Sequence, residues 1–331
     1  MKFKIPDDVK HANMARKLIE VQATQKRAFT LKDIEDSLDC SGGGELDLRG
    51  HGMLDKDMPI LCNFLRMDNA GVQTITTLNL SWNKLCDEGV RMLAKALRDT
   101  DIDIESLNLS YVATGPNSIS SKTWGNLADV VRDIHTVKKF YLKGNYIGYD
   151  DAVAISESLS KATKLKTLKL GRNSIDDRCA VVIAKNIVGS QSCGVRTLDM
   201  GHNKIGPKGV VDVCKAFMEF ENCADIENDS EKRAGTFALK LGGSPIMDGG
   251  AIAISKLVSS SLYLGMIDVA CCGLTDKGIL ALSRAIKSNH ENNGNLKCVF
   301  FDDNHKVSTN ANESIAHEIY HHRTYCSLHS E

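Results

Sequence analysis

One short motif has residue types and a spacing that could do metal chemistry. The segment His317-Glu318-Ile319-Tyr320-His321 matches H-E-x-x-H. On a helix the two histidines share one face, so they could hold zinc while the glutamate acts as a base. Thr324 and Ser327 stand where a longer form of this motif has glycine and a third histidine. We therefore expect no catalytic metal and no cofactor, and at most adventitious metal binding by His317, His321 and His322.

Aromatic and cationic side chains that recur along the middle of the chain could instead bind another macromolecule. Trp, Tyr and Arg are the residue types enriched at the energetic centres of protein interfaces. Their positioning depends on the elements that carry them. The candidate partner-binding residues are Trp82, Tyr111, Tyr141, Lys143, Lys169, Arg172 and His202.

An internal repeat supplies those elements. Its clearest copy is LNLSWNKLCDEGVRMLAKAL at 78–97, and close relatives of this segment begin at 140, 168 and 198. Weaker copies begin at 46, 107, 239, 267 and 299, which makes nine units spaced 28 to 41 residues apart. Each unit follows L-x-L-x-x-N-x-I/L, then polar residues, then a helical apolar pattern. One strand-and-helix unit is therefore repeated along the chain.

Each part of the repeat has a physical reason. The alternation L-x-L predicts a short strand with one buried face that pairs in parallel with the next strand. Val90, Leu93 and Leu97 place apolar groups on one side of a helix. A single unit cannot bury its apolar face, so the units should stack into an α/β solenoid with a parallel concave sheet and convex helices. The turn after each strand should bond to neighbouring repeats through the side-chain amides of Asn83, Asn145, Asn173 and Asn203.

The ends and two insertions depart from the repeat. Residues 44–308 hold the repeats, and we expect 1–43 to form an N-terminal helical cap, with helix over 7–38 broken near Thr30. Residues 309–331 should form a C-terminal capping helix and tail, with a Thr or Asn as N-cap. The segments 111–122 and 220–236 break the period. They are either surface loops or sites of partner contact.

The alternation also predicts which residues are available for binding. If the leucines point inward, the residues between them point onto the opposite face of the sheet. Trp82, Tyr111 and Tyr141 lie on adjacent repeats and could form a ladder of exposed aromatics. Alternatively, Trp82 and Tyr111 fold back over neighbouring side chains. Asp302 and Asp303 make one end of the face acidic. The centre of the face should be basic because of Lys139, Lys143, Lys169 and Arg172.

Composition excludes several classes of function. The net charge is −1, which argues against a nucleic-acid partner. No run of 18 apolar residues occurs, so we expect no membrane span. The eleven cysteines are an odd number, and Cys179, Cys214 and Cys272 fall at core positions of the repeat. Without a signal-peptide pattern at the start, this predicts reduced thiols and a cytoplasmic protein.

The repeat resembles the leucine-rich repeats of ribonuclease inhibitor, NOD-like receptors, tropomodulin and the Ran GTPase-activating protein. That resemblance covers about 44–308 and implies a horseshoe-shaped solenoid that binds a protein partner. The segment Gly171-Arg172-Asn173 is similar to a G-R-N segment of the Ran GTPase activator, so Arg172 and Asn145 could act on a GTPase. No phosphate loop or nucleophile motif occurs, so we expect no small-molecule substrate. The sequence thus favours a non-enzymatic interaction module or scaffold subunit, with a GTPase-activating protein as the alternative.

Overall fold

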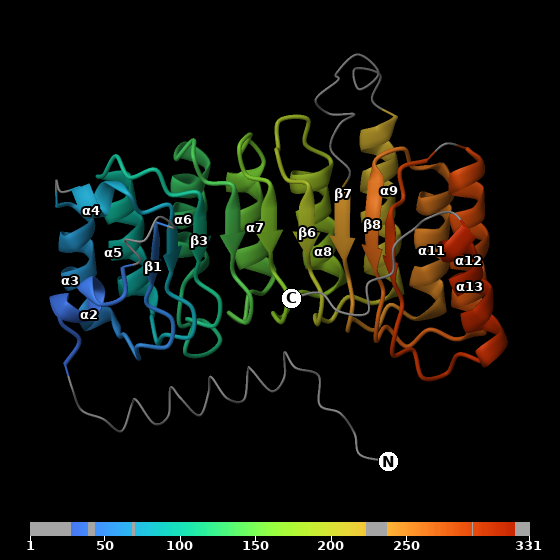
Figure 1. Cartoon of the computed structure of the whole chain (residues 1–331), viewed down its shortest axis with the longest axis horizontal. Coiled ribbons are helices and arrows are strands. Elements are labelled where there is room, and N and C mark those ends of the chain that lie inside the picture. Colours follow the sequence, from blue (N-terminus) through green and yellow to red (C-terminus); the bar gives the residue numbers. More distant parts are fainter. Residues whose placement is uncertain (1–27, 39–43, 68–69, 223–236, 293, 322–331) are drawn as a thin grey trace. The chain divides into compact units, whose positions relative to one another are not determined.

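Nine short strands alternate with helices along the described part of the chain, as the repeat predicts (Figure 1). The computed structural model describes residues 28–38, 44–67, 70–222, 237–292 and 294–321. The chain divides into two compact units, Met1–Tyr146 and Ile147–Glu331, called unit 1 and unit 2 below. Each unit contains several consecutive repeats, and each repeat contributes a strand and a helical segment.

Unit 1 contains four strands that pair in parallel in sequence order. Its strands are β1 (Glu45–Asp47), β2 (Thr77–Asn79), β3 (Ser106–Asn108) and β4 (Lys139–Tyr141). Its helices are α2 (Leu31–Glu35), the 3₁₀ turn η1 (Asp55–Asp57), α3 (Met58–Leu65), α4 (Ala70–Gln73), α5 (Asp87–Arg98) and α6 (Ser121–Asp133).

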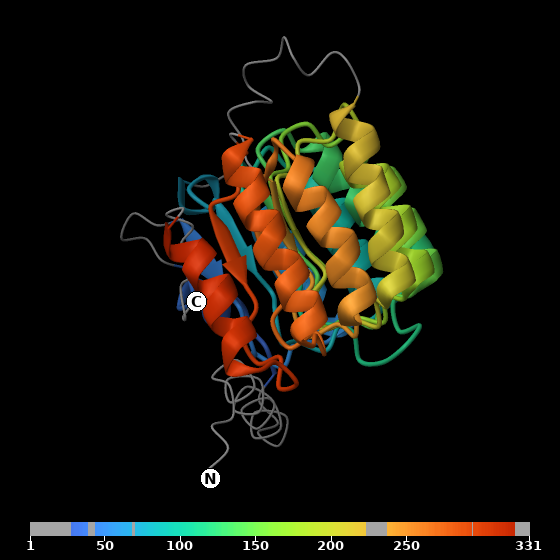
Figure 2. The same cartoon turned by 90° about the vertical axis from the view of Figure 1, so that its right-hand side faces the viewer.

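Unit 2 contains five strands, again parallel and in sequence order. In Figure 2 its helices α9, α11 and α12 lie side by side against one face of the strands. The strands are β5 (Thr167–Lys169), β6 (Thr197–Asp199), β7 (Phe237–Lys240), β8 (Leu264–Asp268) and β9 (Cys298–Phe300). The helices are α7 (Tyr149–Leu159), α8 (Asp177–Ile183), the π-helical turn η2 (Ala184–Val188), α9 (Pro207–Glu221), α11 (Met247–Ser260), α12 (Asp276–Glu291) and α13 (Thr309–His321).

The strand register confirms the predicted repeat. In unit 1, Leu46 pairs with Leu78, Leu78 with Leu107, and Leu107 with Phe140, and all four side chains are buried. The equivalent residues pair in the same way from β5 to β9. The inner face of the strands in each unit therefore carries rows of apolar side chains. In α5 the predicted face of Val90, Leu93 and Leu97 is buried against this core.

The asparagines after the strands bond adjacent repeats together, also as predicted. The Asn83 amide donates to the carbonyls of Leu48 and Leu80, and its oxygen accepts the N–H of Met53. Asn203 bridges repeats in the same way in unit 2. Position 112 lacks the expected Asn, but the oxygen of Asn145 accepts the N–H groups of Val112 and Ala113. These bonds satisfy buried backbone groups at each tight turn.

The ends of the repeat array differ in part from the prediction. At the start, α2 begins after Thr30, and the expected helix over 7–27 lies outside the described residues. Ser37 accepts the Asp47 N–H, so the segment after α2 bonds to β1. At the other end the expected N-cap at a Thr or Asn was wrong, because the Ser308 hydroxyl accepts the Ala311 N–H at the start of α13. Across the described residues, no helix is long and apolar enough to cross a membrane.

Candidate interaction surface

The turn after each strand places one residue in the left-handed backbone conformation. We call these nine residues the turn row. Non-glycine residues rarely adopt positive φ because Cβ then crowds the backbone. In unit 1 the row comprises Gly50, Trp82, Tyr111 and Gly144, with φ from 57° to 70°. In unit 2 it comprises Arg172, His202, Gly243, Cys271 and Asp303.

Trp82 and Tyr111 form a stacked aromatic pair on the turn row of unit 1. Their ring centroids are 4.0 Å apart and the ring planes differ by 12°. Both side chains are half-buried. A Cβ placed on Gly144 would come within 2.2 Å of the Tyr111 ring, so this ring lies over the glycine. The pair thus presents an amphipathic surface, held in place by the repeat.

The predicted ladder of three aromatics is divided between two positions of the repeat. Tyr141 lies in β4, where it pairs in register with Asn108 rather than following the strand. The turn row continues from Tyr111 to Gly144 instead. Burial raises the pKa of the half-buried Tyr141 hydroxyl, although a hydrogen bond with the Ser106 side chain lowers it. Lys143 is half-buried and lies just before Gly144, where its carbonyl accepts the Tyr111 N–H.

Unit 2 carries the other three predicted partner-binding residues. Lys169 lies in β5 and is half-buried, whereas Arg172 and His202 follow one another along the turn row. The His202 ring is exposed and covers Gly243, because a Cβ there would lie 2.3 Å from the His202 Nδ1. These side chains therefore occupy neighbouring repeats within one unit.

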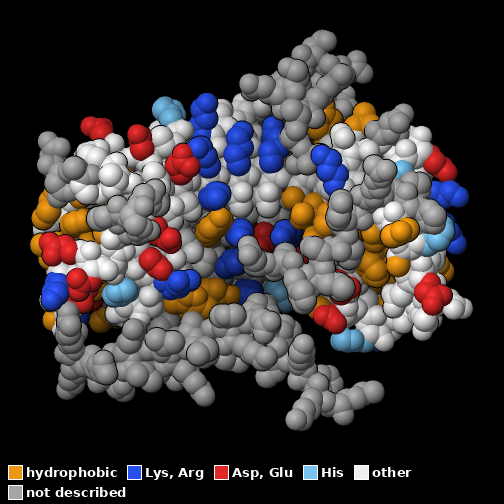
Figure 3. Space-filling model, viewed as in Figure 1, with side chains coloured by type: hydrophobic (Ala, Val, Ile, Leu, Met, Phe, Trp, Pro, Cys, Tyr) orange, Lys and Arg blue, Asp and Glu red, His pale blue; other side chains and the backbone are white. Residues whose placement is uncertain are grey.

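The face that carries the strands is charged, as the sequence predicts. Figure 3 shows Lys and Arg side chains gathered over β4 in unit 1 and over β5 to β7 in unit 2. Asp268 lies farther along unit 2, in β8, and burial raises the pKa of its carboxyl. The charge of Lys240 opposes that increase, while Asp199 and Asp302 add to it. Within unit 2 the carboxylates of Asp199, Asp268 and Asp302 therefore lie near enough to one another and to Lys240 to interact electrostatically.

Several polar residues between the inward leucines have structural partners. The Asn79 and Asp199 side chains accept the N–H groups of Ser81 and Gly201, two residues on. Asn79 and Asp199 are both buried. Asn145 and Asn173 are also buried, and their amides bond to backbone carbonyls. The Asn145 side chain is therefore used in hydrogen bonds within the fold and is not placed to act on another protein. Of the two residues considered for action on a GTPase, Arg172 is the one that stays a candidate.

The H-E-x-x-H segment, residues 317–321, forms the last residues of α13. His317 is exposed and its Nδ1 lies 3.6 Å from the Glu318 carboxylate. The His321 side chain and the whole of His322 lie outside the residues whose side chains are described. Metal binding by these histidines therefore stays a prediction.

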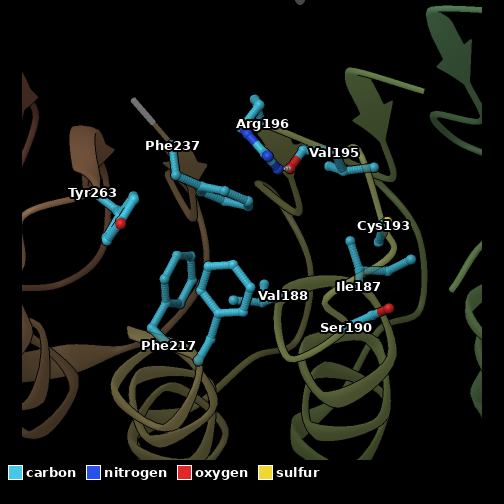
Figure 4. A pocket seen from close by; sticks show the side chains of 10 residues that line it. Ile187, Val188, Ser190, Cys193, Val195, Arg196, Phe217, Phe237 and Tyr263 are labelled. Atoms are coloured by element: carbon cyan, nitrogen blue, oxygen red, sulfur yellow. Dashed lines mark hydrogen bonds between the residues drawn. The ribbon is translucent and has the colours of Figure 1, made fainter. Parts of the chain in front are cut away.

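Sequence reasoning missed an apolar pocket in unit 2 (Figure 4). The Phe217 and Phe237 rings meet edge to face with centroids 4.7 Å apart, and both are buried. Arg196 lies on the strand side of the pocket, where its guanidinium donates to the Val195 carbonyl. The only sequence signal was the phenylalanine-rich end of α9, which is equally expected of a core helix. The pocket offers little polar chemistry, so we assign no reaction to it.

Comparison with known proteins supports the repeat assignment. The family described as "Leucine Rich repeat" matches residues 73–94, 191–214 and 267–283. Over 237 residues the chain is 26% identical to ribonuclease inhibitor of Sus scrofa, covering 65% of this chain and 49% of that protein. It is 32% identical to NACHT, LRR and PYD domains-containing protein 13 of Homo sapiens over 144 residues, covering 44% of this chain and 13% of that protein. The chain thus spans about half the length of the ribonuclease inhibitor and a small part of the longer relative.

Among solved structures, the yeast Rad7–Elc1 complex aligns with 93% of this chain and 81% of the matched chain, at 11% identity and a TM-score of 0.39. The assignment rests on the family match, the sequence relatives and the strand register.

Proposed function

Because this chain is a leucine-rich-repeat protein of the ribonuclease-inhibitor-like type, we propose that it is a non-enzymatic interaction module, or scaffold subunit, that binds a protein partner. Ribonuclease inhibitor, one of its relatives, is named for acting on a ribonuclease, which is another protein. The observation that carries the proposal is the Trp82–Tyr111 stack. Large aromatic side chains on a surface are the usual energetic centres of an interface.

The backbone conformation of these aromatics supports a role beyond packing. At the equivalent positions 50, 144 and 243 the chain uses glycine, which adopts positive φ without steric cost. Trp82 and Tyr111 adopt the same conformation at a cost of about 1–2 kcal/mol each. Strained residues that persist on a surface are often retained for function. We therefore assign the partner-binding surface of unit 1 to Trp82, Tyr111, Tyr141 and Lys143. Lys169, Arg172 and His202 form a separate candidate surface of unit 2.

We also propose that the protein works in the cytoplasm. The eight cysteines in the described residues are free thiols. Burial raises the pKa of Cys179, Cys214 and Cys272 to about 12, which keeps these thiols protonated and unreactive. A core built with free thiols is typical of proteins from reducing compartments.

The test is affinity capture followed by binding measurements on the purified partner. The test variant is Trp82→Gly/Tyr111→Gly, which removes both rings at positions where glycine is well tolerated. The matched control is Tyr146→Gly, since Tyr146 is an exposed aromatic with a φ of 61° that lies outside the turn row. We expect the double variant to weaken binding by a hundredfold or more, about 2.7 kcal/mol, and the control to bind as wild type.

The same experiment separates the proposed module from a GTPase-activating protein. If the captured partner is a GTPase whose GTP hydrolysis this chain accelerates, Arg172→Ala should abolish that acceleration and weaken binding far less than the double glycine variant does. Retention of every partner by the double glycine variant would overturn the assignment of the site to the aromatic stack.

A further inference from the structure

Within the described residues, the turn row of unit 1 begins with a glycine where the next two members carry aromatic rings. Gly50 occupies the same position in its repeat as Trp82 and Tyr111, with a φ of +70°. Its N–H donates to the Ser81 carbonyl, just as Trp82 donates to Ser110 and Tyr111 to Lys143. Gly50 therefore lies beside Trp82 as Trp82 lies beside Tyr111.

Each ring in this row covers the next repeat. Trp82 stacks on Tyr111, and Tyr111 covers Gly144, where an added Cβ would meet the tyrosine ring at 2.2 Å. By contrast, a Cβ on Gly50 would meet no described atom within 4 Å. A side chain at position 50 would cover the face of the Trp82 indole opposite Tyr111, and glycine supplies none. Among the described residues, the row thus begins with a stacking place that no side chain of the row fills.

We propose that the space beside Gly50, against the face of Trp82 opposite Tyr111, receives an aromatic side chain of the protein partner. This inference rests on the proposed function and names the partner group that the site recognises. The bound ring continues the row with the stacking geometry that Trp82 and Tyr111 already show. A partner ring here gains both apolar burial and an aromatic pair.

The surroundings favour a neutral ring over a charged group. Gly50 lies between Arg49 and His51 in the sequence, and the Arg49 side chain is 58% exposed. The Arg49 guanidinium pairs with Asp47 at 3.0 Å, and the His51 Nε2 lies 3.3 Å from the Ser37 hydroxyl, so both side chains already have partners in the chain. The face of an aromatic ring carries partial negative charge, which disfavours an anion. An uncharged aromatic needs no counter-charge at this place.

Substitution of Gly50 tests the proposal directly. Gly50→Tyr should fill the place from within, because aromatic residues already occupy positions 82 and 111 with the same backbone conformation. Gly52→Tyr is the matched control, since Gly52 also has positive φ, +67°, and open space around a Cβ, but it lies outside the turn row. Both variants place a tyrosine at positive φ and so carry a similar backbone strain. A difference in ligand binding between them therefore reports on the space beside Trp82.

The probe is N-acetyl-tyrosine amide, and the readout is the indole N–H resonance of Trp82 in ¹⁵N-labelled full-length protein. The chain has two tryptophans, and Trp124 is buried, so its resonance is an internal control. We expect the tyrosine amide to shift Trp82 with millimolar affinity in wild type and in Gly52→Tyr. In Gly50→Tyr the shift should fall about tenfold. N-acetyl-arginine amide should produce the weaker shift in wild type.

An absent Trp82 shift, an equal shift in Gly50→Tyr, or a stronger response to the arginine amide would each overturn the inference. The proposed function fails separately, when Trp82→Gly/Tyr111→Gly keeps its partner. If that double variant loses the partner while the tyrosine amide leaves Trp82 unmoved, the interaction surface stands and the stacking place does not.

Discussion

At the scale of single residues, the left-handed conformation of Trp82 and Tyr111 sets two free-energy contributions against each other. Replacing Tyr111 by glycine removes about 1–2 kcal/mol of backbone strain but also removes a stack worth about 0.5–1.5 kcal/mol. Glycine further raises the entropy of the unfolded chain by up to about 1 kcal/mol. We therefore expect Tyr111→Gly to change the free energy of unfolding by less than about 1 kcal/mol in urea denaturation. A loss of several kcal/mol would show that the ring supports the fold.

In contrast to Tyr111, Asn203 should contribute strongly to the free energy of unfolding. Its buried amide donates to the carbonyls of Leu170 and Met200, and its oxygen accepts the Ile175 N–H. Asn203→Ala leaves these groups without partners, at about 1–3 kcal/mol for each buried group. We expect at least about 3 kcal/mol of destabilisation in urea, whereas Asn292→Ala at the exposed end of α12 should cost under about 0.5 kcal/mol. An equal, small effect of the two would contradict the bridging role.

The difference between these two residues shows what the sequence could predict at this scale. The asparagine bridges were predictable because a tight turn must satisfy its backbone groups and the repeat supplies Asn at the right spacing. The stacking of Trp82 on Tyr111 was not, because L-x-L alternation fixes which face a strand residue occupies but not the dihedral angles of the turn beyond it. For the same reason Tyr141 was grouped with the stack although it belongs to the strand.

At the scale of elements, a carboxylate at the start of one helix bonds to the start of the next. Asp87 of α5 accepts the Ser120 N–H before α6, and Asp177 of α8 accepts the Gly206 N–H before α9. Asp248 makes the same bond to Thr275. These bonds satisfy N–H groups that a helix leaves unpaired at its start and place negative charge there. Sequence analysis missed them because one Asp near a helix start is common, and only the stacking shows that it serves the neighbouring helix.

This arrangement predicts an acid-sensitive connection between α5 and α6. Burial alone would raise the pKa of Asp87, but hydrogen bonds with Ser120 and Thr123 and the charge of Arg91 outweigh burial, so its pKa is lowered. A folded-state pKa below the unfolded value stabilises the fold above the unfolded pKa of about 3.9, and the stabilisation is lost as the pH falls below that value. Asp87→Asn should therefore destabilise the protein at pH 7, and the difference from wild type should disappear as the pH falls through the lowered folded-state pKa of Asp87.

Chemical denaturation across this pH range measures the difference between wild type and Asp87→Asn. Asp212→Asn is the control, because its carboxylate pairs with Lys215 within α9 rather than bonding to the next helix. A difference between wild type and Asp87→Asn that is constant with pH would contradict the ionic character of the bond.

At the scale of the whole molecule, the described repeats form two compact units, with the boundary between Tyr146 and Ile147. The sequence predicted the repeats and their order but not this boundary, because the motif spacing of 28 residues from 140 to 168 is ordinary for this chain. In a solenoid each repeat contacts only its neighbours, so a local defect should spread along adjacent repeats. The two units should therefore respond differently to damage within one of them.

Leu168→Asp tests this expectation. Leu168 is fully buried in β5 and pairs in register with Leu198, so an aspartate would be a buried charge without a partner. The destabilisation should reach about 4 kcal/mol or more, among the largest that single substitutions cause. In hydrogen exchange, peptides from β5, β6 and α8 should lose protection first, while α5 and β2 of unit 1 keep theirs. Lys169→Asp, on the opposite face of the same strand, should leave all of them protected. Equal loss of protection in both units would mean that the repeats unfold as one cooperative array. The boundary between Tyr146 and Ile147 would then separate regions of dense contacts but not regions that unfold independently.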